Sequence, residues 1–211
     1  MKLILLGAPG AGKGTQSAIL GDRYGIPTVS TGNLLRAAIK ECSTEEDRIA
    51  KEYVERGELV PDDIIIDIVK KRIADEDCRK GFILDGMPRT IRQADALEES
   101  GIHIDCALAI EADDDFIIHR LGGRLTCSGC GASYHEINNP PKTEGKCDRC
   151  GHDLIVREDD RDETIRARIA IYHEMSEPLK EYYAQRGVLH TVDGTQGIEE
   201  TTKAIVKALE I

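Results

Sequence analysis

A glycine-rich segment near the N-terminus has the residue types and spacing of a phosphate-binding loop. Residues 7–15 read GAPGAGKGT, which fits the pattern G-x-x-x-x-G-K, with Gly14 and then Thr15 where the common form has Ser or Thr directly after the Lys. Glycines let the backbone turn so that several N–H groups face one anion, and Lys13 adds a full positive charge. An ordinary glycine-rich turn is the alternative, but the preceding apolar run, the spacing and the Lys together favour phosphate binding.

A carboxylate suited to metal-assisted phosphate chemistry follows the apolar run at residues 82–84. The run reads as a buried strand, and Asp85 comes at its C-terminal end. An acid in that position beside a phosphate loop is placed to hold Mg²⁺ directly or through water. A solvated carboxylate at a strand end is the alternative.

Four of the seven cysteines have the spacing of a zinc site. Cys127 and Cys130 form one C-x2-C pair, Cys147 and Cys150 form another, and sixteen residues separate the pairs. Four thiolates complete a tetrahedral shell and leave no open position, so the Zn²⁺ is predicted to be structural. The alternatives are two disulfides, a coincidence of spacing, or a nucleic-acid-binding ribbon. The last is disfavoured because this segment is not notably basic. Three other cysteines are expected to be ordinary packed or surface thiols: Cys42, Cys78 and Cys106.

Arginines occupy the ends of predicted elements in a chain whose formal net charge is −11. The planar guanidinium binds phosphate bidentately and stays charged. One nucleotide needs fewer such groups, so we infer two phosphorylated ligands that meet end to end. The arginines concerned are Arg36, Arg89, Arg120, Arg124, Arg157 and Arg168.

The reaction inferred from this inventory is phosphoryl transfer to a phosphate acceptor. The oxygen of such an acceptor is already anionic at neutral pH, so no general base is needed, and we identify none in the sequence. What remains is to hold the reactants in line and to neutralise charge on the moving group, which Lys13, the arginines and Mg²⁺ can do.

Apolar runs alternate with helical patterns along the chain, which predicts an α/β fold with a parallel sheet and helices on both faces. Strands are expected at residues 3–6, 26–30, 81–85, 105–110 and 188–192. Helices are expected after the glycine loop, from residue 34, at about 44–56, 62–74, from 113, at 162–185 and at the C-terminus. Residues 126–156 are expected to be an irregular insert in which metal substitutes for a hydrophobic core.

Composition limits the class of protein. A chain of 211 residues with this acidic balance is not suited to broad binding of nucleic acid or of anionic membranes. No run approaches the roughly 20 apolar residues of a membrane span, and the glycine loop interrupts the N-terminal run before a signal peptide could form. We therefore expect a cytoplasmic protein whose cysteines do not form disulfides.

Taken together, these segments resemble adenylate kinase in its long-lid, zinc-containing form. The segments that carry the resemblance are residues 7–15, 30–36, 59–63, 81–89, 120–124 and 159–168. The resemblance covers essentially the whole chain and implies the P-loop NTPase fold with a five-stranded parallel sheet. It also implies three domains: a core of residues 1–29, 61–122 and 164–211, a helical AMP-binding arm of residues 30–60, and a zinc-binding lid of residues 123–163.

The resemblance further implies roles for individual residues. The ATP-binding residues would be Gly10, Ala11, Gly12, Lys13, Gly14, Thr15, Arg120, Arg124, Ser133, Tyr134 and Gln196. The AMP-binding residues would be Thr31, Arg36, Glu58, Leu59, Val60, Gly86, Met87, Pro88, Arg89, Gln93, Arg157 and Arg168. The catalytic groups would be Lys13, Asp85, Arg89, Arg124, Arg157 and Arg168.

The activity implied is reversible phosphoryl transfer from Mg-ATP to AMP, giving two ADP, by a monomer that serves AMP salvage and adenine nucleotide homeostasis. A lid that closes on hinges near residues 122 and 160 would exclude water. Three positions depart from the family: Asn33 for the usual Asp, Met87 for Phe, and Gln196 for a frequent Lys. Two alternatives stay open, namely a uridylate/cytidylate kinase, which usually has a short lid without cysteines, and a nucleotide-dependent switch that binds a partner through its zinc ribbon.

Overall fold

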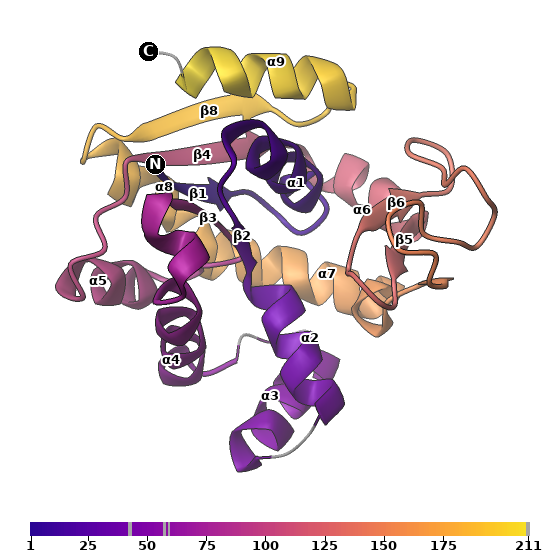
Figure 1. Cartoon of the computed structure of the whole chain (residues 1–211), viewed down its shortest axis with the longest axis horizontal. Helices are drawn as coiled ribbons and strands as arrows, with labels where there is room; N and C mark the ends of the chain where they lie inside the picture. Colours follow the sequence, from indigo (N-terminus) through magenta and orange to yellow (C-terminus); the bar gives the residue numbers. More distant parts are fainter. Residues whose placement is uncertain (42–43, 57, 59, 210–211) are drawn as a thin grey trace.

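A parallel sheet forms the centre of the molecule. The computed structural model describes residues 1–41, 44–56, 58 and 60–209. Within those residues, five parallel strands pair in the order β2-β3-β1-β4-β8, which confirms the predicted α/β fold (Figure 1). The strands are β1 (Lys2–Leu6), β2 (Thr28–Ser30), β3 (Phe82–Asp85), β4 (Cys106–Glu111) and β8 (Leu189–Asp193).

Helices cover both faces of this sheet, as its continuously apolar strands require. Side chains alternate along β1, so that Leu3 and Leu5 pack on one face and Ile4 and Leu6 on the other. Helices α1 (Lys13–Tyr24) and α9 (Ile198–Leu209) cover the first face. Helices α4 (Asp62–Ile73), α5 (Ile91–Glu99) and α8 (Pro178–Ala184) cover the second, and the 3-10 turn η1 (Glu76–Lys80) precedes β3.

Two helices project from the sheet at the C-terminal end of β2 (Figure 1). They are α2 (Thr31–Glu41) and α3 (Glu45–Arg56). The prediction that the first of them begins at Leu34 after a polar cap was wrong by one turn. The Thr31 hydroxyl donates to the Asp85 carbonyl oxygen, 3.3 Å away, instead of capping a later turn. The first helical residue is thereby tied to β3.

The insert that was expected to be irregular contains a small antiparallel sheet, so this expectation was wrong in part. Its strands are β5 (Arg124–Cys127), β6 (Ser133–His135) and β7 (Leu154–Ile155), paired in the order β6-β5-β7. Strands of two to four residues leave no readable alternation in the sequence. The first C-x2-C turn creates the pairing, because the Cys127 N–H donates to the Ala132 carbonyl oxygen at 2.9 Å.

The stems of the insert are α6 (Asp114–Gly122) before it, and the 3-10 turn η2 (Glu158–Asp160) with α7 (Asp162–Ile171) after it. The long helix expected over residues 162–185 forms, but in two α-helical parts. A π-helical turn, η3 (Tyr172–Ser176), separates α7 from α8. Pro178 is the physical reason, because proline lacks the N–H and crowds the carbonyl four residues earlier. Among the helices described, none combines the length and the apolar character needed to cross a membrane.

Candidate active site

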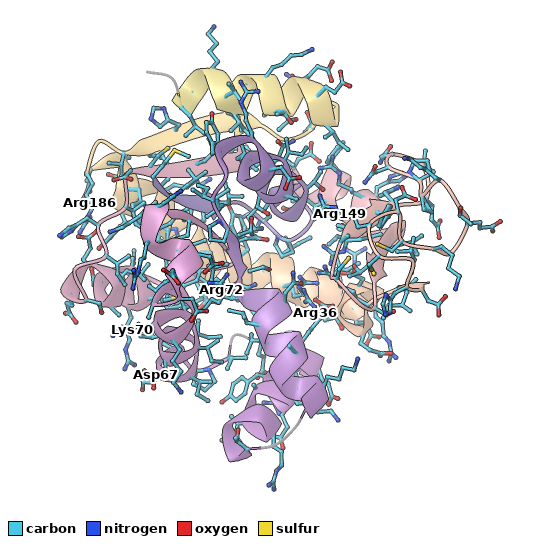
Figure 2. All side chains as sticks on the ribbon, viewed as in Figure 1. Arg36, Asp67, Lys70, Arg72, Arg149 and Arg186 are labelled. Carbon is cyan, nitrogen blue, oxygen red and sulfur yellow. The ribbon has the colours of Figure 1, made fainter. Side chains whose placement is uncertain are left out.

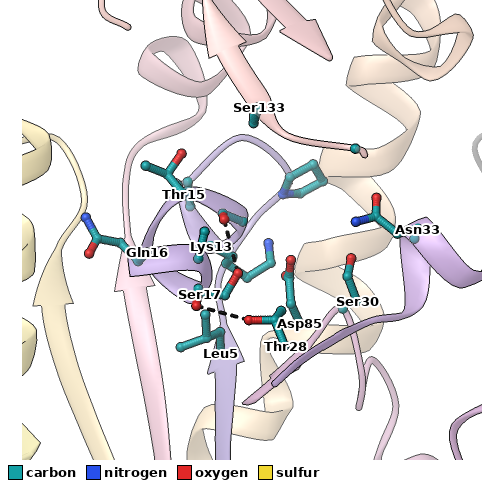
Figure 3. A pocket seen from close by; sticks show the side chains of 18 of the residues that line it. Leu5, Lys13, Thr15, Gln16, Ser17, Thr28, Ser30, Asn33, Asp85 and Ser133 are labelled. Atoms are coloured by element: carbon teal, nitrogen blue, oxygen red, sulfur yellow. Dashed lines mark hydrogen bonds between the residues drawn. The ribbon is translucent and has the colours of Figure 1, made fainter. Parts of the chain in front are cut away.

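A cleft of about 860 Å³ opens where β1 and β3 end, at the edge of the sheet where ligands bind in open α/β folds. Its walls come from segments that are distant in the sequence: the glycine loop, α2, the 85–89 turn, the insert and α7. Figure 3 shows Lys13, Asp85 and Ser30 turned toward one space, with Ser133 of the insert above it. The fold therefore collects in one cleft most of the residues that the sequence analysis selected.

The glycine loop needs residues without a side chain. Gly7, Gly10 and Gly12 have φ angles of +139°, +86° and +109°, in the region that L side chains rarely adopt. A Cβ on Gly7 would lie 2.5 Å from the Ile110 carbonyl oxygen. The loop leads directly into α1, whose N-terminal N–H groups and dipole favour an anion.

Lys13 lies folded back across this loop. Its Nζ donates to the carbonyl oxygens of Gly7 at 2.7 Å and of Ala8 at 2.9 Å. Burial lowers the pKa of Lys13 to about 8, against the opposing effect of Asp85. Nearby arginines, Arg89 among them, contribute to this lowering. An anion beside the amine would raise the pKa again, so the loop is an electrostatically favourable place for phosphate.

Two arginines from opposite stems of the insert share one buried carboxylate. Arg124, the first residue of β5, donates from Nε and Nη2 to both oxygens of Asp160, with the Nε contact at 2.7 Å. Arg168 of α7 donates to the same carboxylate at 3.2 Å and lies 3.0 Å from an Asp159 oxygen. The Asp160 side chain is 0% exposed. Asp160 thus holds two arginines of the site, a role that was not predicted from the sequence. The one indication in the sequence is the adjacent pair of acids, Asp159 and Asp160, before α7.

Three further arginines of the cleft contact neutral oxygens. Arg36 donates to Asn33 Oδ1 at 2.7 Å, Arg89 to the Gly86 carbonyl oxygen at 2.9 Å, and Arg157 to Thr126 Oγ1 at 2.7 Å. None of these three contacts neutralises the guanidinium. Burial lowers the pKa of all three arginines, and the positive charge of other arginines adds to the effect. The cleft thus holds positive charge that an anionic ligand would stabilise.

Asp85 closes the floor of the cleft at the end of β3. A Cβ built on Gly14 would lie 3.6 Å from Asp85 Oδ2, so the carboxylate is next to the first turn of α1. Figure 3 shows it beside the Lys13 amine. An oxygen ligand adjacent to a phosphate-binding loop fits Mg²⁺ carried on a bound nucleotide.

The turn after β3 is held by Gln93, a buried residue of α5. Its Oε1 accepts from the Arg89 backbone N–H at 2.8 Å, and its Nε2 donates to Asp62 Oδ1 at 2.6 Å. Asp62 is the first residue of a helix predicted over residues 62–74, and its contact with Gln93 was not predicted. Met87, expected among the AMP-binding residues, is 1% exposed, packs in the core and is not among the residues that line the cleft.

Some of the residues expected to bind ATP beyond the glycine loop line the cleft, and one does not. Arg120 Nη1 lies 3.4, 3.3 and 3.2 Å from the carbonyl oxygens of Gly10, Ala11 and Gly194. Tyr134 and Ser133 line the cleft, and the Tyr134 hydroxyl accepts from the Asp148 N–H at 2.8 Å. Gln196 instead donates to Asp193 at 3.3 Å and does not line the described cleft.

The other expected ligand-binding positions divide in two groups. Those that line the cleft are Gly10, Ala11, Gly12, Gly14, Thr15, Thr31, Glu58, Val60, Gly86 and Pro88. Leu59 lies outside the described residues. The same is true of Cys42, which was expected to be an ordinary thiol and not a ligand. The cleft therefore contains nearly every described member of both nucleotide sets.

The four cysteines of the two C-x2-C pairs come together in the insert. Their sulfur atoms all lie within 4.8 Å of one another, with Cys127 and Cys150 at 3.4 Å and Cys130 and Cys147 at 3.6 Å. These separations are far beyond a disulfide bond of about 2.05 Å and close to the roughly 3.8 Å of a tetrahedral Zn–S4 site. The donor set fits zinc, and the alternative of two disulfides does not fit.

Comparison with known proteins gives one consistent family. Residues 5–188 match the family model described as adenylate kinase. The adenylate kinase of Caldicellulosiruptor saccharolyticus is 51% identical over 100% of both chains, and that of Caldicellulosiruptor bescii is 52% identical over 100% of both. The adenylate kinase of Acetivibrio thermocellus is 51% identical over 99% of this chain and 98% of its own.

Proposed function

Because the chain belongs to the adenylate kinase family, whose members convert ATP and AMP to two ADP, we propose that its basic cleft binds Mg-ATP and AMP end to end. The observation that carries this proposal is the group of half-buried cationic side chains that line the cleft together with Lys13, among them Arg89, Arg124 and Arg168. These cations come from the glycine loop, the turn after β3 and both stems of the insert. One triphosphate does not need all of them, whereas two nucleotides meeting at their phosphates do.

We propose that ATP occupies the half of the cleft between the glycine loop and the insert. The N–H groups of residues 10–15 would bind its phosphates, and Lys13 would leave the loop carbonyls to contact them. The base would lie near Arg120, beside Ser133 and Tyr134. When bound, Mg²⁺ would neutralise phosphate charge, with Asp85 as the residue placed to hold it. Gln196 would have to turn from Asp193 to reach this half.

We propose that AMP occupies the half between α2 and the turn after β3. Thr31 and Arg36 line one wall of it, and Gly86, Arg89 and Gln93 line the other. Arg89 is the phosphate ligand on this side, since its backbone is held by Gln93 and its guanidinium faces the cleft. Arg157 and Arg168 would approach the transferred group from the insert side.

The proposed division into domains follows the projecting segments. Residues 30–60 would be the AMP-binding arm, residues 123–163 the lid, and the rest the core. The two projections lie close together, since a Cβ on Gly131 would lie 3.0 Å from the Asn33 side chain. The insert also contacts the core, because Arg149 lies 3.7 Å from Asp22 of α1. Figure 2 shows Arg149 between the insert and α1 and Arg36 on the side of α2 near the insert. This is the arrangement expected of a closed lid that excludes water.

An acceptor panel tests the assignment of substrates. With Mg-ATP as donor, ADP formation should be fastest with AMP when AMP, UMP, CMP and GMP are compared at equal concentration in a coupled assay. A preference for UMP or CMP would move the enzyme to the uridylate/cytidylate kinases. Slow ATP turnover that ignores every monophosphate would favour a nucleotide-dependent switch. We further propose that the enzyme acts as a cytoplasmic monomer in AMP salvage and adenine nucleotide homeostasis.

Zinc removal is expected to destabilise the lid before it stops the chemistry. Chelation should lower the thermal unfolding midpoint by about 5–10 °C, the shift that roughly 2–3 kcal/mol gives a chain of this size. The reason is that the hydrophobic cluster of the insert, around Tyr134, is small, so the four thiolates and their metal would have to hold the insert together. Calorimetry with and without chelator measures the shift. In a Cys130→Ser variant, chelator should change the midpoint little. An unchanged midpoint in the wild type would refute a structural role for zinc.

A further inference from the structure

The π-helical turn η3 brings a hydroxyl group to the wall of the cleft. The turn is defined by the Glu177 N–H, which donates to the Tyr172 carbonyl oxygen at 2.8 Å, five residues earlier. Ser176, its last residue, lines the cleft. It is the polar member of a helical stripe that is otherwise apolar and buried: Ile165, Ile169, Tyr172, Leu179 and Tyr183. Ser176 itself is half-buried, and a hydroxyl taken partly out of water is more stable with a hydrogen-bond partner.

That partner is the backbone of Arg89. Ser176 Oγ donates to the Arg89 carbonyl oxygen at 2.9 Å, across 87 residues of sequence. The Arg89 N–H donates to Gln93 Oε1 at 2.8 Å, and Arg89 Nε donates to the Gly86 carbonyl oxygen at 2.9 Å. The backbone of Arg89 is thus held from both sides by side chains of two helices. None of the three contacts uses a terminal Nη nitrogen, the atoms that would meet phosphate.

Such fixing matters because Arg89 is in an electrostatically unfavourable position. Burial lowers the pKa of Arg89 to about 10, and the charges of Arg168 and Arg36 add to this effect, whereas Asp85 and Asp159 oppose it. Before a phosphate binds, repulsion from the two arginines and attraction to the two carboxylates would both draw the guanidinium away from the place where that phosphate would bind. A backbone anchor opposes this movement without adding a negative charge that would compete with phosphate. Small displacements of such groups are costly, because in-line transfer depends on geometry.

We propose that Ser176 is a positioning residue for Arg89, which it holds at the AMP side of the cleft through the Arg89 carbonyl oxygen. The inference rests on the role proposed above for Arg89. Ser176 itself touches no reacting atom, and its effect should depend entirely on the guanidinium that it positions. It should be felt with AMP more than with ATP.

A double-mutant cycle tests this inference in the full-length, zinc-loaded enzyme. Ser176→Ala should lower kcat/KM for AMP about threefold to tenfold, the effect of one lost hydrogen bond, and leave KM for ATP unchanged. Ser176→Thr, which keeps the hydroxyl, should restore most of the activity. In an Arg89→Ala background, Ser176→Ala should have no further effect. Ser100→Ala is the matched control, since Ser100 Oγ also donates to a backbone carbonyl oxygen, that of Ala96 at 2.6 Å, in an exposed position away from the cleft.

The outcomes separate this inference from the proposed function. An equal loss from Ser176→Ala with and without Arg89, or an equal rise in KM for ATP, would show a general structural effect and overturn the positioning role. Wild-type kinetics in Arg89→Ala would overturn both the role of Arg89 and the inference built on it. Thermal unfolding of each variant shows whether a loss of folded protein accounts for the change.

Discussion

Lys13→Met is expected to lower kcat/KM for ATP roughly a thousandfold while the enzyme stays folded. Met has a similar length but no charge. In the structure the Lys13 amine is held by the Gly7 and Ala8 carbonyl oxygens, within reach of the loop that would bind phosphate. Removing it deletes the central positive charge at the point where negative charge develops. Steady-state kinetics with AMP at saturation would measure the loss.

The pH dependence of ATP binding gives a second test of the role of Lys13. Its pKa is lowered to about 8 by burial in the free enzyme, and a bound polyphosphate favours the protonated form. Binding therefore takes up a proton above that pH, so ATP affinity in the wild type should fall as pH rises beyond about 8. Lys13→Met should lose this dependence. A variant within about tenfold of wild-type activity would contradict the role given to the amine.

Arg168→Ala is expected to reduce kcat about a thousandfold, and Arg168→Lys about a hundredfold, because charge alone does not replace the planar fork. Arg168 is anchored by the Asp159 carbonyl oxygen at 2.7 Å and by the Asp160 carboxylate. Both partners lie in η2, so the position of the Arg168 guanidinium depends on the stem of the proposed lid. We expect a larger effect on kcat than on either KM, since the contact would form most fully in the transition state.

Arg166→Ala is the control for Arg168. Arg166 lies two residues away on the same helix and is exposed, so its removal tests the loss of one positive charge without changing the cleft. Its kcat should stay close to that of the wild type. If Arg168→Ala kept wild-type kcat, the proposed approach of α7 to the transferred group would be wrong.

Much of the fold was predictable because the signals are local. Continuous apolar runs marked the strands of the central sheet, and the glycine loop showed where α1 would begin. Parallel pairing of β1 with β3 then brings Asp85 to the loop, since parallel strands end at one edge. The zinc-site cysteines were equally predictable from the sequence, because a C-x2-C turn presents both thiols from one short segment.

Other features depended on contacts that no local pattern encodes. The strands of the insert are too short to show alternation, and the π-turn arises from one proline within a helical pattern. Asp62 read as a favourable helix start, whereas its carboxylate binds Thr90 and Gln93 some thirty residues away. The Asp160 carboxylate likewise gains its meaning only when both stems of the insert meet around it.

The most direct test of a two-nucleotide cleft is a crystal structure with two adenosines joined by five phosphates. We predict one such molecule per chain, with its phosphates contacted by the Lys13 amine and by the guanidinium groups of Arg89, Arg124 and Arg168. One adenosine should lie beside Arg120 and the other beside Thr31. An inhibitor bound by one end only, with those guanidinium groups turned to solvent and half of the cleft empty, would contradict the account.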